Sequence, residues 1–138
     1  TYIAWAHRNR SALIRIPAGV DRAKRCELRS PDLSGNPYLQ FAVILAAGLK
    51  GLKEKKSPIK PTEKNIYALS KKEKSALGIE SLPESLGHAL NIMSESNLLK
   101  ETLGNHIFNN FIHVKKEEWD AYRMQVTPWE VKKYLKAI

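Results

Sequence analysis

The sequence has 138 residues, of which 43% are hydrophobic and 27% are charged, and its formal net charge is +9. This composition is typical of a globular domain and excludes a collagen-like, low-complexity or wholly disordered chain. The single cysteine, Cys26, excludes a disulfide scaffold and favours a reducing compartment such as the cytoplasm. The longest apolar run, residues 41–49, is about half of the roughly 20 residues that a membrane span needs, so we expect no transmembrane helix.

The first third of the sequence is typical of β-strands. Short, partly alternating apolar segments predict antiparallel strands at residues 2–7, 11–16 and 26–29. Residues 1–10 begin without Met and resemble neither a signal peptide nor a transit peptide. We therefore expect the chain to be a piece of a longer protein, with strands over about residues 2–30.

From residue 36 onward the pattern changes to that of helices. Asn36 followed by Pro37 predicts a helix start, and a largely buried helix of about four turns should follow. Its apolar positions recur at helical spacing and are Tyr38, Phe41, Leu45, Leu49 and Leu52. Residues 54–69 contain Pro58, Pro61 and scattered lysines, which predicts a loop.

The second half of the sequence is predicted to be helical. Three capping boxes indicate helix starts at Ser70 with Glu73, Ser81 with Glu84, and Thr127 with Glu130. A longer helix is expected over residues 105–122. Strands followed by helices indicate the α+β class, with helices over about residues 36–138.

The positive charge is unevenly distributed. Six of the seven arginines lie within the first 30 residues, whereas lysine dominates from Lys50 onward. A basic surface is compatible with nucleic-acid binding, and the lysine-rich stretch from Lys50 to Lys74 is the place to expect it. The same stretch contains glutamates and prolines, so we favour a solvated loop and helix face, and consider a nucleic-acid partner the less favoured alternative.

The densest candidate site follows the second strand. Alternate side chains of a strand share a face, so Arg25, Glu27 and Arg29 should project together, while Cys26 packs as a small apolar side chain on the other face. One interpretation is an exposed charge ladder of little energetic value. The other is a site in which Glu27 holds a divalent cation and the guanidinium groups hold anionic oxygens. Spacing alone does not decide between them.

Four ordered blocks resemble the C-terminal part of the catalytic domain of type I glutamine synthetase. They are Asn-Arg-Ser-Ala-Leu-Ile-Arg-Ile-Pro at 9–17, Arg-Cys-Glu-Leu-Arg-Ser-Pro-Asp at 25–32, Asn-Pro-Tyr-Leu-Gln-Phe-Ala at 36–42, and Glu-Lys-Asn-Ile-Tyr at 63–67. The tail at 118–130 adds to the match, which covers essentially residues 1–138. The resemblance implies a ligase that uses ATP to join ammonia to L-glutamate through a γ-glutamyl phosphate, as in nitrogen assimilation.

The resemblance also implies roles for individual residues. Glu27 matches a ligand of a divalent metal, Mg²⁺ or Mn²⁺. Arg29 and Arg10 match catalytic residues that contact glutamate, and Arg10, Arg15 and Arg22 match positions that contact ATP. Arg22 stands where the family commonly has Lys, and it keeps the charge of that residue but not its shape. Tyr67 matches a position that some bacterial members modify with AMP, and we favour packing against a neighbouring helix for it.

The resemblance further indicates what lies outside this segment. The remaining metal ligands of the family precede the first residue of this chain, so the isolated 138 residues should be inactive. The family forms two stacked rings of subunits, and residues 127–138, with an apolar surface that includes Ile138, are suited to joining the rings. A related ligase that uses another amine stays open as an alternative, because the amine pocket lies largely outside the chain.

Overall fold

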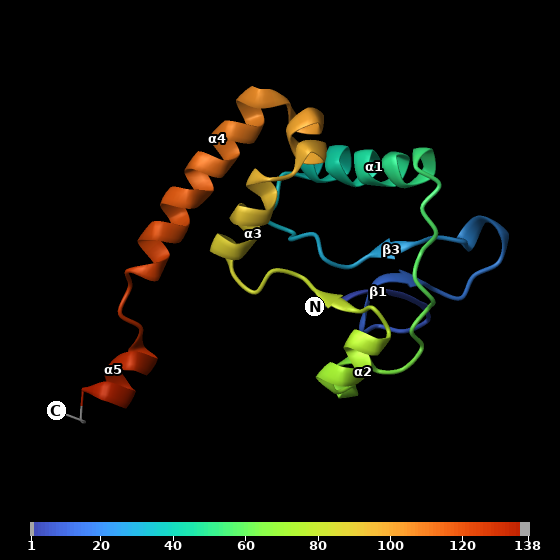
Figure 1. Cartoon of the computed structure of the whole chain (residues 1–138), viewed down its shortest axis with the longest axis horizontal. Coiled ribbons are helices and arrows are strands. Elements are labelled where there is room, and N and C mark those ends of the chain that lie inside the picture. The colour runs from blue at the N-terminus through green and yellow to red at the C-terminus, as the bar shows by residue number, and fades with distance from the viewer. Residues whose placement is uncertain (1, 136–138) are drawn as a thin grey trace. The chain divides into compact units, whose positions relative to one another are not determined.

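The computed structural model describes residues 2–135, which form four strands, five α-helices and two short 3-10 helices. The chain divides into two compact units, Thr1–Glu84 and Ser85–Ile138. The strands belong to the first unit, and the described residues of the second form only helices (Figure 1). This arrangement confirms the predicted α+β class with a mainly helical C-terminal half. None of the described helices is both long and apolar enough to cross a membrane.

Strands β1 (Tyr2–His7), β2 (Ala12–Ile16), β3 (Glu27–Leu28) and β4 (Glu80–Ser81) form one sheet in the order β3-β2-β1-β4. The pairs β2–β3 and β1–β4 are antiparallel. The central strands β1 and β2 run parallel, so the prediction of antiparallel strands is wrong for this pair. The sequence pattern does not indicate β4, because a strand of two residues is too short to show alternation.

Residues 8–11 join the two parallel strands, a connection that ordinarily takes a dozen or more residues. Asn9 Oδ1 accepts hydrogen bonds from the backbone N–H and the hydroxyl of Ser11 at 2.9 and 2.8 Å. Asn9 Nδ2 donates to the carbonyl oxygens of Thr62 and Lys64 at 2.7 and 2.9 Å. These last partners come from a distant part of the chain, so the local pattern could not indicate the direction of β2.

The core of the first unit is small and consists mostly of alanine and aliphatic side chains. Its buried members are Ala4, Ala6, Ala12, Ile66, Leu69 and Ile79, with Tyr2 packed against them. Ile66 opens the 3-10 helix Ile66–Ala68, which is the one regular turn in the predicted loop over residues 54–69. Tyr67 of this turn lies edge-on to Tyr2 of β1, with ring centroids 5.8 Å apart, and is otherwise largely exposed.

Helix α1 (Pro37–Lys53) begins as predicted. Asn36 Oδ1 accepts a hydrogen bond from the N–H of Tyr38 at 3.0 Å, and Pro37 takes the first helical position. The predicted burial is wrong, because α1 contains no buried residue and makes no extensive contact with another described helix or strand. The helical spacing of apolar residues indicates that the helix has an apolar stripe, but it does not indicate whether another element covers that stripe. We call this stripe the α1 apolar face, and its exposed members are Tyr38, Phe41, Leu45, Leu49 and Leu52.

Two of the three predicted capping boxes are present. They begin helix α2 (Lys71–Ala76) and helix α5 (Pro128–Tyr134). In each, the N-cap hydroxyl accepts from a backbone N–H and the glutamate three residues later accepts from the N-cap backbone N–H. The residues of these boxes are Ser70 with Glu73 and Thr127 with Glu130.

The third predicted box, Ser81 with Glu84, is wrong. Ser81 belongs to β4, where its backbone pairs with β1. The next helix is capped by Ser85, whose hydroxyl accepts from the N–H of His88 at 3.1 Å. Ser81 therefore pairs with a strand instead of capping a helix. The local sequence could not indicate this, because the partner strand β1 lies far away in the chain.

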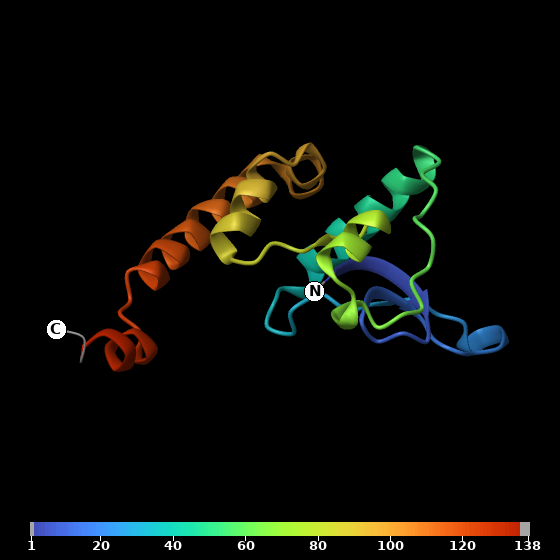
Figure 2. The same ribbon diagram turned by 60° about the horizontal axis from the view of Figure 1, so that its bottom comes forward.

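In the second unit, helix α3 (Leu86–Ser94) lies alongside helix α4 (Asn97–Arg123) (Figure 1, Figure 2). Gly104 breaks α4 with φ of 70° and ψ of 159°, a conformation that is essentially reserved for glycine. The part after this break corresponds to the helix predicted over residues 105–122.

Each of these two helices contributes one buried apolar side chain, Leu90 in α3 and Phe108 in α4. Gly87 comes so close to the Trp119 ring that an added Cβ would lie 2.6 Å from its atoms. Trp119 in turn lies beside Tyr122, with ring centroids 5.9 Å apart. A side chain at position 87 would therefore force the Trp119 ring to move, which favours glycine at this crossing.

Candidate active site

The register of β2 and β3 places Arg15 directly opposite Glu27. Arg15 Nη1 donates a hydrogen bond of 2.7 Å to Glu27 Oε2. The two side chains are 19% and 27% exposed, so water screens this ion pair only partly. Opposite charges on directly paired strand positions attract each other, and the sheet thus fixes the carboxylate beside the guanidinium.

Arg25 binds the other oxygen of the same carboxylate. Its Nη2 and Nε lie 3.0 and 3.3 Å from Glu27 Oε1, which confirms that the two side chains share a face. Cys26 between them is exposed, so the prediction of a packed cysteine is wrong. The reason is that β3 contains only Glu27–Leu28, and Cys26 precedes the part of the chain that the sheet holds.

The two arginines hold the pKa of the Glu27 carboxyl below its usual value. The hydrogen bond from Arg15 is the largest cause, partial desolvation opposes it, and the hydrogen bond from Arg25 adds to the lowering. Glu27 is therefore negatively charged at neutral pH. Arg15 Nε is buried and has no hydrogen-bond partner among the described residues. We call Arg15, Arg25 and Glu27 the ion triad.

The other three arginines predicted for the site lie on different elements. Arg10 is exposed in the connection before β2, and Arg22 is exposed in a one-turn 3-10 helix. Arg29 is exposed directly after β3. Within residues 2–135, no hydrogen bond or ion pair joins any of them to Glu27. The structure thus brings together Arg15, Arg25 and Glu27 of the predicted residues, and among the described residues it leaves Arg29, which was expected on the same face, without a bond to this carboxylate.

Glu27 is the only carboxylate of the ion triad, whereas a divalent-cation site usually has several oxygen ligands. The described residues contain no group of three or more His, Cys, Asp or Glu side chains that could hold a metal ion. An ionised carboxylate such as that of Glu27 is a suitable oxygen ligand for Mg²⁺ or Mn²⁺. Glu27 therefore fits as one ligand of such an ion, while a complete site needs ligands from outside the described segment.

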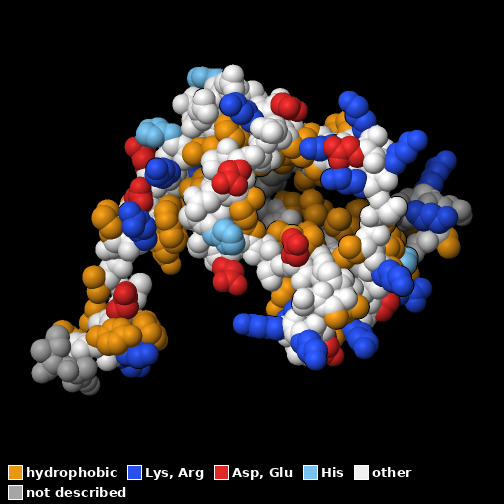
Figure 3. All heavy atoms as spheres, in the orientation of Figure 1, with side chains coloured by type: hydrophobic (Ala, Val, Ile, Leu, Met, Phe, Trp, Pro, Cys, Tyr) orange, Lys and Arg blue, Asp and Glu red, His pale blue; other side chains and the backbone are white. Residues whose placement is uncertain are grey.

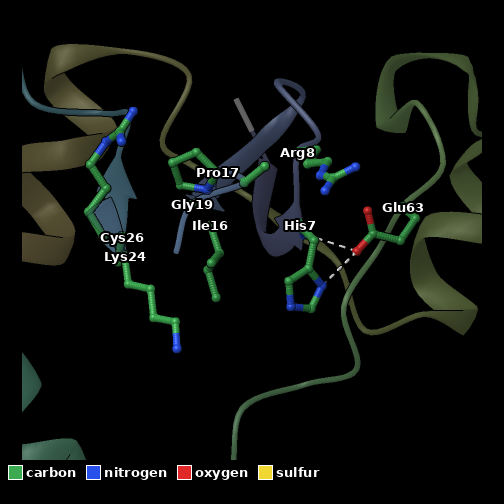
Figure 4. Close-up of a pocket in the computed structure, with 10 residues that line it drawn as sticks. His7, Arg8, Ile16, Pro17, Gly19, Lys24, Cys26 and Glu63 are labelled. Carbon is green, nitrogen blue, oxygen red and sulfur yellow. Dashed lines mark hydrogen bonds and ion pairs between the residues drawn. The ribbon is translucent and has the colours of Figure 1, made fainter. Parts of the chain in front are cut away.

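A cavity of about 920 Å³ is lined in part by Arg25, a member of the ion triad. Its other charged lining groups are Arg8, Lys24 and Glu63. His7 Nδ1 lies 3.1 Å from Glu63 Oε1, and the His7 backbone N–H donates to the same oxygen at 2.9 Å. Figure 4 shows this pair at one side of the cavity and Lys24 at the other. Sequence reasoning missed the pair, because 56 residues separate its members.

The lysine-rich stretch from Lys50 to Lys74 has local partners. Lys50 and Lys56 lie 3.7 and 3.1 Å from the carboxylate of Glu54. Lys74 Nζ donates to the Tyr2 hydroxyl at 2.8 Å. Figure 3 shows Lys and Arg side chains at separate places on the visible face instead of in one continuous stripe. These pairings favour a solvated face over a nucleic-acid-binding stripe.

Comparison with known proteins adds a second line of information. A solved structure described as "Apo GmaS without ligand" matches with a TM-score of 0.78 and 34% sequence identity, over 96% of this chain and 30% of that chain. The chain is 54% identical over 134 residues to the glutamine synthetase of Methanococcus maripaludis. It is 47% identical over 135 residues to the glutamine synthetase of Staphylococcus aureus.

The matched region is nearly all of this chain but a minor part of each relative. The alignments cover 97% and 98% of the chain, and the chain spans about 30% of the length of these two relatives. Residues 1–134 also match the family described as glutamine synthetase, catalytic domain. The chain therefore belongs to the glutamine synthetase family, as a segment of its catalytic domain.

Proposed function

We propose that the complete protein ligates ammonia to L-glutamate at the expense of ATP, by way of a γ-glutamyl phosphate, and so supplies glutamine in the cytoplasm. The observation that carries this proposal is the ion triad, in which the sheet holds an ionised carboxylate between two guanidinium groups. The exposed arginines on neighbouring elements add cationic groups for anionic substrates. Phosphoryl transfer depends mainly on positioning and on neutralising charge, which such groups supply.

Each predicted residue then has a role. Arg29 and Arg10 act on the substrate glutamate and on the phosphoryl group in transfer, and Arg10, Arg15 and Arg22 bind the phosphates of ATP. A guanidinium offers a planar fork that can bind two oxygens of a carboxylate or phosphate at once. Arg15 is already oriented by its bond to Glu27, so less freedom is lost when it binds a phosphate.

Glu27 serves as one ligand of a Mg²⁺ or Mn²⁺ ion. When bound, such an ion neutralises charge on the phosphate oxygens. The remaining ligands would come from the part of the protein outside this segment, because the described residues provide no others grouped with Glu27. We therefore propose that the 138 residues alone do not turn over and that activity belongs to the complete protein.

The complete protein is proposed to be a homo-oligomer built as two stacked rings. Helix α5 is suited to joining the rings, because it holds only seven residues and cannot be stable alone in water. Its exposed apolar side chains need a surface to cover them, and those described are Trp129, Val131, Tyr134 and Leu135. Ile138, predicted to extend this surface, lies outside the described residues.

The test is an assay of the complete protein for ATP-dependent formation of glutamine, with ammonium compared with small alkylamines as the acceptor. We expect ammonium to be used with the higher kcat/KM. Glu27→Ala should lower activity by at least about a hundredfold, as typical for loss of one electrostatic stabiliser. Near-wild-type turnover of this variant at saturating Mg²⁺ would contradict the metal role of Glu27. A higher kcat/KM with an alkylamine would identify a related γ-glutamyl-amine ligase instead.

A further inference from the structure

Both oxygens of the Glu27 carboxylate are engaged by arginine. Arg15 Nη1 lies 2.7 Å from Oε2, and Arg25 Nη2 lies 3.0 Å from Oε1. A divalent cation binds the same oxygens that these guanidinium groups occupy, and it is repelled by their positive charge. Cation binding to Glu27 is therefore opposed by the charge of both guanidinium groups and by the lone-pair sites that they already occupy.

The two arginines differ in how firmly they are held. Arg15 belongs to β2, is paired with Glu27 by the strand register and is 19% exposed. Arg25 lies outside the sheet, is 57% exposed and lines the cavity described above. An exposed ion pair is worth little because water screens it and holding the long side chain costs entropy. The bond between Arg25 and Glu27 is thus the one that yields at low cost.

We propose that Arg25 is a positioning residue that occupies Oε1 of Glu27 until a divalent cation displaces it. This inference rests on the proposed role of Glu27 as a metal ligand. While the pair is intact, Arg25 holds the carboxylate in place and compensates its charge. When the cation displaces Arg25, its guanidinium group can turn into the cavity that Arg25 and Lys24 both line. Arg25 therefore sets the affinity for the cation without binding it.

The proposal predicts the direction in which cation affinity changes when Arg25 is removed. If Arg25 competes with the cation, its removal tightens cation binding, whereas a residue that merely supports Glu27 would weaken binding when removed. Lys24→Gln is a matched control, since Lys24 is the adjacent residue, lines the same cavity and carries the same charge. Within the described residues, no hydrogen bond or ion pair joins Lys24 to Glu27.

The experiment measures Mn²⁺ affinity of the complete protein by electron paramagnetic resonance, without substrates. Glu27→Gln identifies the binding phase that depends on Glu27. For that phase we expect Arg25→Gln to tighten binding about fivefold, the range of an exposed ion pair, and Lys24→Gln to change it by less than about twofold. Arg25→Lys, which keeps the charge but not the fork, should fall between wild type and Arg25→Gln. Far-ultraviolet circular dichroism confirms that each variant is folded.

The possible failures are distinguishable. Loss of a binding phase in Glu27→Gln, together with Arg25→Gln no tighter than Lys24→Gln, overturns the inference and leaves the proposed function intact. Unchanged Mn²⁺ binding in Glu27→Gln removes the metal role of Glu27 and overturns the inference with it. Weaker binding in Arg25→Gln than in wild type would also overturn it, because Arg25 would then support the ligand instead of competing for it.

Discussion

The hydroxyl oxygen of Ser11 accepts a hydrogen bond of 3.1 Å from the backbone N–H of Ile66, a residue 55 positions further along the chain. Ser11 is 7% exposed and Ile66 is fully buried, so water cannot replace this bond. The bond ties the connection between the two parallel strands to the turn that completes the core. Stability of the first unit should therefore depend on a hydroxyl group that belongs to no helix or strand.

Ser11→Ala leaves the Ile66 N–H buried without a partner and should lower the free energy of unfolding by about 1–3 kcal/mol. Ser34→Ala is the matched control. Each serine hydroxyl donates 2.8 Å to a side-chain oxygen two residues earlier, but Ser34 is exposed. The control should change stability by less than about 0.5 kcal/mol. Urea unfolding of the chain measures both, and equal effects would contradict the importance of the buried bond.

Gly104 and Gly48 should respond to alanine with opposite signs. An added Cβ meets no atom within 4 Å at either position, so only the backbone distinguishes them. Gly104 has φ of 70°, and alanine there should cost about 1–3 kcal/mol in strain. Gly48 lies inside α1, where alanine should stabilise the helix by about 0.5–1 kcal/mol. Thermal unfolding of the two variants checks the signs, and destabilisation by both would contradict this account.

Helix α2 should lose its cap in acid. The hydrogen bonds that Ser70 donates, from its hydroxyl at 2.6 Å and its backbone N–H at 2.8 Å, hold the pKa of the Glu73 carboxyl below its ordinary value. The stabilisation is complete above the unfolded pKa, roughly 4.3, and is lost as the pH falls through the lower folded pKa. Amide exchange of Ser70 followed by NMR against pH should show this loss.

The Glu73→Gln variant provides the comparison for that titration. It should abolish the acid-dependent change at Ser70, because an amide has no proton to gain in this range. Glu84→Gln, outside any capping box, should leave the change in place. Persistence of the transition in Glu73→Gln would assign it to another group.

Arg29→Lys should impair the complete protein, although the charge is kept. An ammonium group cannot bind two oxygens in the planar geometry of a guanidinium. We expect a higher KM for glutamate together with a lower kcat in a steady-state assay. Arg123→Lys, an exposed change in α4 with an ion pair to Asp120 only 2.8 Å long, serves as the control and should leave both constants unchanged. Unaltered constants in Arg29→Lys would remove this residue from the site.

Deletion of residues 127–138 from the complete protein should convert double rings to single rings. The measurement is molar mass by light scattering, with circular dichroism to confirm that the remainder stays folded. The alternative is that α5 packs against its own subunit, in which case the full mass persists after deletion. A truncation that only shortens the tail after Leu135 is a useful comparison, because it retains the whole of α5.

Features encoded within a few residues were the ones that the sequence could predict. Asn36 with Pro37, Ser70 with Glu73 and the pairing of Arg25 with Glu27 all depend on spacings of one to three residues, and the structure contains each of them. Features that depend on distant partners were not predicted. The parallel direction of β2 rests on Asn9 and its bonds to Thr62 and Lys64, and the pairing of His7 with Glu63 spans 56 residues.

The local contacts of the candidate site were predicted from the sequence, and its contacts between strands were not. Strand alternation identified the shared face of Arg25 and Glu27, but not the bond from Arg15, which depends on the register between β2 and β3. Cys26 shows the limit of the same reasoning. Strand β3 begins only at Glu27, so the sheet holds neither Cys26 nor Arg25, and alternation placed the arginine correctly but not the cysteine. The roles of Arg10, Arg22 and Arg29 come from family resemblance, because local spacing does not relate these residues to Glu27.

The α1 apolar face has a consequence for quality control in the cell. Its members are 55–82% exposed, and they follow one another along a single helix. Chaperones and proteases select chains by exposed apolar segments of this kind. A copy in which this face stays uncovered therefore carries its own signal for retention or degradation, and one in which it is covered loses that signal. Covering the α1 apolar face would thus shield the protein from both kinds of recognition.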